Sequence, residues 1–173
     1  MPQRAHWLAV DHEHRAPATA YAHRLRARFA ETDAMGVVHH ASYPAWLEVA
    51  RVELLRASGH PYTEVRAGGI DFAVVDLNLH YERPVHFDDE VIVTVWFAGA
   101  SRASFELRYE LRVGAERCVT ASTRHAAVGL DGRPRRLPRW VTELAGDATP
   151  AIAPGATITP GATLHRGTAG STC

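Results

Sequence analysis

The chain has 173 residues, with 19 basic and 19 acidic side chains, so its formal net charge is zero. This balance argues against a protein that binds nucleic acid through a basic surface. Hydrophobic residues make up 46% of the sequence, enough for one folded core. No run approaches the ~20 apolar residues of a membrane span, and the N-terminus lacks the apolar core of a signal peptide. We therefore expect one cytoplasmic domain without a membrane span.

The cysteine and histidine content gives little support for a metal site. Cys118 and Cys173 provide neither a metal-ligand spacing nor a disulfide framework, which fits a reducing compartment. Residues 11–14 read Asp-His-Glu-His, with His6 and His23 nearby, and could hold a metal ion. Because no zinc-like pattern with a fourth ligand is present, we interpret this segment as a solvated arm. We expect no metal and no cofactor.

Hydrophobic patterning predicts an irregular arm over residues 1–20, followed by a strand over about residues 23–29. In this strand Leu25, Ala27 and Phe29 alternate with arginines, so one face should be wet.

A polar turn and a helix come next in the chain. Ser42 is a suitable N-cap, and Pro44 is tolerated in a first helical turn because its missing N–H would have no partner there. The helix should end near residue 57, before the Ser-Gly-His-Pro of residues 58–61. Free N–H groups at its start could hold a negative charge or a developing oxyanion. The residues that predict the helix recur on one face: Tyr43, Trp46, Leu47, Ala50 and Leu54.

Asp33 lies in the turn before this helix, three residues ahead of Gly36. A glycine at that place allows a backbone conformation that other residues resist. Judged by spacing alone, Asp33 is a turn or capping residue, because aspartate is common in both roles.

The rest of the domain is predicted to be mostly strand. After a short helical piece near residues 62–66, four strands follow without an intervening helix, which we interpret as a meander and hence an α+β fold. Residues 146–173 are rich in Gly, Ala, Thr and Pro, so we predict a disordered tail after a domain spanning residues 21–145. The four strands are expected at residues 70–81, 91–97, 104–113 and 116–128.

Two segments resemble a known family. Residues 31–48 contain Thr-Asp-Ala-Met-Gly-Val-Val followed by His40, Tyr43 and Glu48. This segment is similar to the active-site segment of the 4-hydroxybenzoyl-CoA thioesterase-like family of hotdog-fold acyl-CoA thioesterases. Residues 71–91 resemble the family's long second strand, its Arg-Pro turn and the start of the next strand. The similarity covers about residues 21–140, and the two segments together are more specific than Asp-x-x-Gly alone.

The resemblance implies a fold, an activity and an assembly. The fold is a hotdog, in which a five-stranded antiparallel sheet wraps one long central helix. The activity is hydrolysis of an acyl- or aroyl-CoA thioester to free acid and CoA. The implied assembly is a homodimer or homotetramer, which fits the need to hide long sheet edges.

The resemblance also implies site residues. Asp33 would be the base or the nucleophile, and the sequence does not separate these roles. A backbone N–H at or near His40 would polarise the carbonyl, while the His40 ring could position substrate or water, or have no role. Gly36 and Tyr43 would contact substrate. Arg102, in the turn of residues 99–105, would contact the nucleotide phosphates of CoA, or be a solvated turn arginine.

Other functions remain as alternatives. The thioester could be carried by acyl carrier protein instead of CoA. A hotdog dehydratase or hydratase fits less well, because such relatives place a catalytic histidine in a different part of the helix segment. A non-catalytic acyl-binding protein would not need Asp33. Serine catalysis lacks a Gly-x-Ser-x-Gly elbow, and Cys118 lacks the context of a nucleophile.

Two expectations concern side-chain contacts. Glu48 and Arg51 lie three residues apart on the helix and can form an ion pair. Four apolar residues could line an acyl pocket or fill the core, and they do not specify the acyl group: Trp46, Phe72, Val74 and Leu77.

Overall fold

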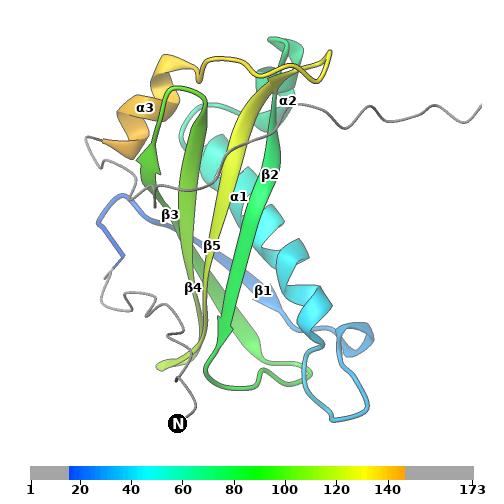
Figure 1. Cartoon of the computed structure of the whole chain (residues 1–173). Helices are drawn as coiled ribbons and strands as arrows, with labels where there is room; N and C mark the ends of the chain where they lie inside the picture. The colour runs from blue at the N-terminus through cyan, green and yellow to red at the C-terminus, as the bar shows by residue number, and fades with distance from the viewer. Residues whose placement is uncertain (1–15, 147–173) are drawn as a thin grey trace, which may run out of the picture.

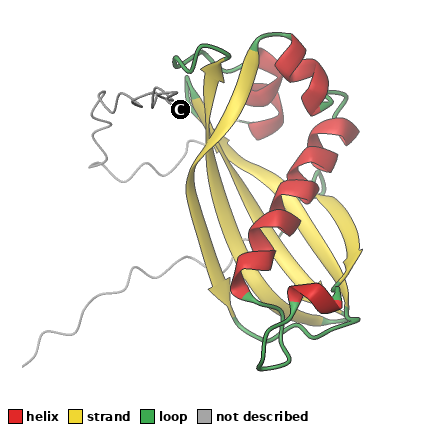
Figure 2. Cartoon of the chain, turned by 90° about the vertical axis from the view of Figure 1, so that its right-hand side faces the viewer, coloured by secondary structure: helices red, strands yellow, loops and turns green. Residues whose placement is uncertain are grey.

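Five antiparallel strands form one sheet in the order β1-β3-β4-β5-β2, in a computed structural model that describes residues 16–146. A long helix, α1, lies across one face of this twisted sheet (Figures 1 and 2). The predicted α+β class and five-stranded antiparallel sheet are therefore confirmed. The strands are β1 (Tyr21–Arg26), β2 (Ile70–Tyr81), β3 (Glu90–Ala100), β4 (Ser104–Val113) and β5 (Glu116–Gly129). The helices are α1 (Tyr43–Ala57), α2 (Tyr62–Ala67) and α3 (Arg139–Ala145), with 3₁₀ turns η1 (Phe29–Glu31) and η2 (His40–Ser42).

The core fills the space between α1 and the inner face of the sheet. On β4, Phe105, Leu107, Tyr109 and Leu111 are buried and alternate with partly exposed charged residues, as a half-buried strand requires. The predicted apolar face of α1 is buried throughout, from Tyr43 to Leu54.

The start of α1 differs from the prediction. Helical structure begins at His40, because η2 leads directly into α1. The Nδ1 atom of His39 accepts the Ala41 N–H at 3.2 Å and so caps this first turn. Ser42 does stand at the N-cap position of α1, but it already has helical backbone angles and its side chain makes no capping hydrogen bond. The side-chain cap comes from His39, a residue type that is not among the preferred caps, so the sequence did not predict it.

The predicted four-strand meander is also wrong. Strands β3, β4 and β5 do form a meander, but β2 pairs with β5 at the far edge of the sheet. Residues 82–89 therefore connect two strands that are not neighbours. Alternation of apolar residues identifies strands but not their partners, because it reports only which face is buried.

The ends of the domain hold two further differences. The first strand ends at Arg26, and Phe29 lies in η1 with 76% of its surface exposed. Helix α3 was not predicted; its Val141 is fully buried, and it packs against β3. No helix within residues 16–146 is long and apolar enough to cross a membrane. The predicted tail and most of the predicted arm lie outside the described residues.

Candidate active site

A tight loop at residues 31–39 lies immediately before the first turn of helix (Figure 1). Its two sides are joined by the Asp33 N–H donating to Val37 O at 2.9 Å and the His39 N–H donating to Glu31 O at 2.8 Å. The Val38 N–H donates to Val85 O at 2.7 Å, which fixes the loop to the segment after β2. Residues 82–89, which connect β2 to β3, thus hold the loop that carries Asp33 in place.

Asp33 is held by its own turn. Its Oδ1 accepts the Met35 N–H at 2.8 Å, and its carbonyl accepts the Gly36 N–H at 2.9 Å. Gly36 has a φ of 76°, so the expected special backbone conformation is confirmed. Within residues 16–146, no side chain or backbone group donates to the second carboxylate oxygen of Asp33. That oxygen is available to a substrate or a water molecule.

His40 brings a backbone donor to the same loop. It is the first residue of η2, and its N–H has no acceptor among the described residues. The first N–H groups of a helix carry partial positive charge, so this group suits an oxyanion. The His40 ring is exposed, and its centroid lies 4.0 Å from the centroid of the His39 ring. The Tyr81 hydroxyl donates to His40 O at 3.4 Å. The peptide units around His40 are therefore held on both sides.

Glu31 is a site residue that the sequence did not reveal. Its carboxylate accepts hydrogen bonds from the Trp46 Nε1–H at 3.0 Å and from the Arg28 backbone and side chain at 2.8 and 2.7 Å. Burial by itself would raise the pKa of Glu31, but the bonds from Arg28 and Trp46 outweigh it and lower the pKa. A glutamate two residues before Asp33 is ordinary in sequence; only its burial makes it notable.

Tyr43, expected to contact substrate, lies in the core of the single chain. Its side chain is packed against Trp46 and Tyr81, with ring centroids 5.1 and 5.2 Å away. Burial, with smaller contributions from Tyr81 and Cys118, raises the pKa of Tyr43 to about 12, so the hydroxyl stays neutral. Contact of Tyr43 with substrate stays a prediction.

Arg102 lies at the other end of the sheet from Asp33. It sits in the turn after β3, whereas the Asp33 loop pairs with His86, just before β3. The 11 residues of β3 separate these ends by roughly 30 Å or more at ~3.3 Å per residue. If Arg102 contacts substrate bound at Asp33, the two residues must come from different copies of the chain.

Two contact expectations are corrected. Arg51 and Glu48 form no ion pair within the described part of the chain; Arg51 is 6% exposed and lies over the Tyr62 ring, 5.2 Å from its centroid. The helix turns Arg51 toward the core and leaves Glu48 exposed. On β2, Val74 and Leu77 are 56% and 43% exposed, so they do not fill the core of the single chain. Trp46 and Phe72, the other two candidates, are buried.

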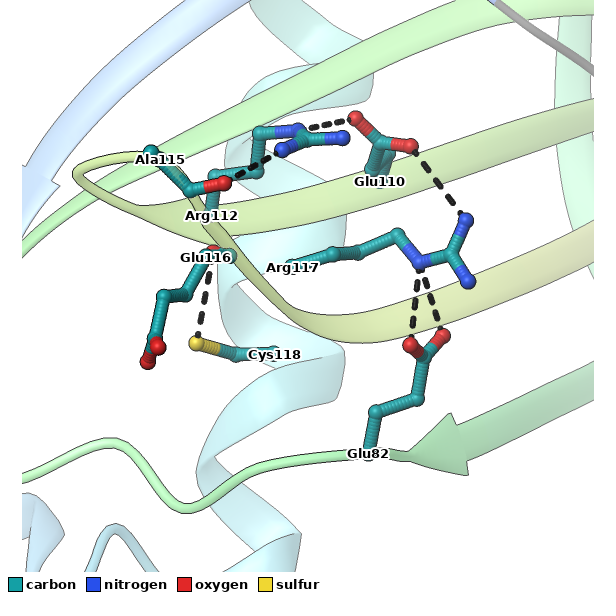
Figure 3. Close-up of polar contacts among 7 residues, drawn as sticks. All are labelled: Glu82, Glu110, Arg112, Ala115, Glu116, Arg117 and Cys118. Carbon is teal, nitrogen blue, oxygen red and sulfur yellow. Dashed lines mark hydrogen bonds and ion pairs between the residues drawn. The ribbon is translucent and has the colours of Figure 1, made fainter.

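Cys118 lies on β5 with its thiol turned to the backbone (Figure 3). The Sγ–H donates to Glu116 O at 3.7 Å, and burial raises the pKa of the thiol, which disfavours the reactive thiolate. Arg117, the residue before Cys118 on β5, forms an ion pair with Glu82, which directly follows β2. The Arg117 Nε lies 2.9 Å from a Glu82 carboxylate oxygen, so this contact links the β4–β5 hairpin to the end of β2 (Figure 3). These contacts give Cys118 a structural role in the sheet and do not support a role as a nucleophile.

No group of three or more metal-ligating side chains occurs within residues 16–146. The His-rich segment 11–14 lies outside the described residues, so its interpretation as a solvated arm stays a prediction.

Comparison with known proteins identifies the family. A family model described as the thioesterase superfamily matches residues 35–120. A putative esterase from Aquifex aeolicus is 32% identical over 127 residues, which are 73% of this chain and 98% of that protein. The chain belongs to the thioesterase superfamily.

Two more specifically named relatives agree with this thioesterase assignment. The putative acyl-CoA thioesterase YneP from Bacillus subtilis is 39% identical over 72 residues, 42% of this chain and 52% of that protein. A DHNA-CoA thioesterase from Staphylococcus aureus, known from a crystal structure, is 33% identical in sequence to this chain. The match covers 68% of this chain and 80% of that protein's chain, with a TM-score of 0.66. The resemblance drawn from the sequence is confirmed, as is the reaction class of a thioester hydrolase.

Proposed function

We propose that the protein hydrolyses an acyl- or aroyl-CoA thioester, with Asp33 as base or nucleophile and the His40 N–H as oxyanion donor. The names of two relatives support the substrate class, since one is called an acyl-CoA thioesterase and the other a DHNA-CoA thioesterase. The observation that carries the mechanism is the loop itself. It presents a carboxylate oxygen and a helix-start N–H, both without partners among the described residues.

The chemistry follows from these two groups. A thioester carbonyl oxygen bound at the His40 N–H gains stabilisation as negative charge develops on it, a term worth ~10²–10³ in rate in comparable hydrolases. In one route Asp33 takes a proton from water, the hydroxide attacks the carbonyl carbon, and the C–S bond breaks to release the CoA thiolate. In the other route Asp33 attacks directly, releases the thiolate, and forms an anhydride that water then hydrolyses. Both routes yield a carboxylic acid and CoA.

The proposal includes an assembly. Among the described strands β2 lies at the edge of the sheet; it has 12 residues and exposes Val74, Val75 and Leu77 (Figure 1). Long apolar edges are normally covered. We infer a homodimer in which the β2 strands of two copies lie side by side and join the two sheets into one. In this hotdog arrangement the joined sheet would wrap the α1 helix of each copy.

The activity is tested by following free-thiol release from a panel of aliphatic and aromatic acyl-CoAs. We expect turnover on at least one member, and less than a tenth of that rate with the same acyl group on acyl carrier protein. Faster turnover on acyl carrier protein would show that the proposed substrate, acyl-CoA, is wrong. No thiol release from either carrier would contradict the proposed thioesterase function.

A further inference from the structure

Glu31 bonds the turn that carries Asp33 to the start of α1 through its side chain. Its carboxylate, on a residue only 9% exposed, accepts the Trp46 Nε1–H at 3.0 Å. Trp46 lies in the first turn and a half of α1, so this bond reaches from the loop to the body of the helix. The Arg28 guanidinium donates to the same carboxylate oxygen at 2.7 Å, and the Arg28 N–H donates to the other oxygen at 2.8 Å.

The backbone of Glu31 forms a second connection to the same helix start. Its carbonyl oxygen accepts the His39 N–H at 2.8 Å and the Ser42 hydroxyl at 3.2 Å. The Ser42 N–H in turn donates to His39 O at 2.9 Å. These bonds fix the His39–His40 peptide unit, which carries the N–H without an acceptor.

We propose that Glu31 is a positioning residue that sets the separation between the Asp33 carboxylate and the His40 N–H. This inference rests on the proposed thioesterase function. Asp33 is two residues from Glu31 along a tight loop, and the Glu31 carbonyl accepts from the His39 N–H and the Ser42 hydroxyl, on either side of the His40 N–H. A misplacement of about 1 Å between reacting groups can cost 10²-fold in rate. Both carboxylate oxygens of Glu31 are engaged by Trp46 and Arg28, and the proposed role of this carboxylate includes no proton transfer.

The first experiment replaces Glu31 by glutamine, which keeps the shape but not the charge. A glutamine oxygen cannot accept from Trp46 and from both Arg28 donors as the carboxylate does. We expect kcat for an acyl-CoA to fall at least tenfold, with KM within twofold of wild type. The matched control is Glu106→Gln, which breaks another Glu–Arg hydrogen bond, the 3.0 Å contact with Arg108 on β4, and should leave kcat unchanged.

The pH profile separates positioning from catalysis. Because Glu31 moves no proton, the profile of Glu31→Gln should lie lower at every pH and keep an acid limb. Loss of the acid limb would make Glu31 the base and overturn the assignment. Wild-type kcat in a folded Glu31→Gln protein would also overturn it.

A double-mutant cycle tests the route through the helix. Trp46→Phe removes the indole N–H and keeps an aromatic ring. If Glu31 acts through Trp46, the two losses in kcat should not multiply, and the double variant should resemble Glu31→Gln alone. Independent, multiplying losses would contradict this route. If Glu31→Gln does not fold, Trp46→Phe alone must lower kcat with KM unchanged.

A spectroscopic readout keeps this inference separate from the proposed function. In Glu31→Gln, the NMR signals of the Trp46 indole N–H and of the His39 and His40 amides should shift together, and hydrogen exchange of the indole should accelerate. The same signals should stay in place in Glu106→Gln. Unmoved His39 and His40 signals would overturn the positioning role even if the enzyme is active. Absence of thiol release by wild type, with these signals shifted, would contradict only the proposed function.

Discussion

At the scale of single residues, the buried His125 couples stability to pH. Its side chain is 1% exposed, its Nε2 lies 2.8 Å from Thr123 Oγ1, and its ring stacks on Phe105. Burial, followed by the charge of Arg51, lowers the pKa of His125 from 6.5 to about 3. The imidazole therefore stays neutral in the folded protein where the unfolded chain is protonated.

The sign of the pH effect follows from proton uptake. Between pH 6.5 and about 3 the unfolded state binds a proton at this site and the folded state does not, so the free energy of unfolding falls as pH falls. The slope is up to about 1.4 kcal/mol per pH unit. We expect His125→Leu to show a shallower loss of stability between pH 7 and pH 5 in urea unfolding. Equal slopes in parent and variant would contradict a neutral buried His125.

The left-handed backbone conformation of Gly36 can be tested by substitution, with Gly132 as a matched control. Gly36 and Gly132 both have a φ of 76°, and no atom lies within 4 Å of the place that an alanine Cβ would occupy at either position. Alanine at either place should therefore cost only the left-handed conformation, about 1–2 kcal/mol. Gly36→Ala should also lower kcat, because it strains the turn that carries Asp33, whereas Gly132→Ala should not. Equal kcat in both variants would argue against a functional need for this turn geometry.

The sequence predicted some of these residues and not others. Asp33 and Gly36 stand in a local motif, so their turn could be predicted from neighbouring residues. Glu31, Arg51 and His125 are polar residues whose burial depends on strands and helices distant in sequence. Local patterns favour an exposed position for such side chains, because charged residues are rarely buried. Their contacts therefore became visible only in the folded chain.

At the scale of secondary structure, the existence of the strands was easier to predict than their order. Strong alternation along β4 and the apolar face of α1 follow directly from residue spacing. The pairing of β2 with β5 depends on residues 82–89, whose path has no periodic signal. The seven residues of α3 were too few to show a helical repeat beside Pro138. Short elements and strand neighbours thus required the tertiary structure.

Helix α3 should contribute to stability without affecting chemistry. Val141 is fully buried, whereas Leu144 on the same helix is 41% exposed. We expect Val141→Ala to lower the free energy of unfolding by about 2 kcal/mol through lost packing, and Leu144→Ala to have little effect. Because α3 lies at the end of the sheet opposite the loop of residues 31–39 (Figure 1), kcat should stay at the wild-type value in both variants. Equal stabilities would show that Val141 is not packed as described.

At the scale of the whole molecule, the separation of Arg102 from Asp33 makes the assembly part of the proposed mechanism. Light scattering at micromolar concentration should give at least a dimer mass, and a monomer would contradict the inferred assembly. Arg102→Ala should raise KM for acyl-CoA with little change in kcat, the signature of lost uniform binding. It should barely affect an acyl-pantetheine substrate, which lacks the nucleotide phosphates.

Mixed assemblies test whether the two residues come from different copies. A dimer of one Asp33→Asn chain and one Arg102→Ala chain would contain one site with both changes and one site with neither. We therefore expect unfolding and refolding the two variants together to restore turnover at low acyl-CoA concentration. If Arg102 served the Asp33 site of its own chain, every site would carry one defect, and mixing would give only the average of the two variants.

The most direct test of the proposed chemistry is kcat of Asp33→Asn, measured beside its melting temperature. Asparagine keeps an oxygen that can accept the Met35 N–H, and it serves as well as aspartate in caps and turns, so the fold should persist. It is a poor base and a poor nucleophile. We predict a melting temperature close to wild type, retained substrate binding, and a kcat lower by at least ~10². A folded Asp33→Asn protein with near-normal kcat would contradict the assignment of Asp33 and the mechanism built on it.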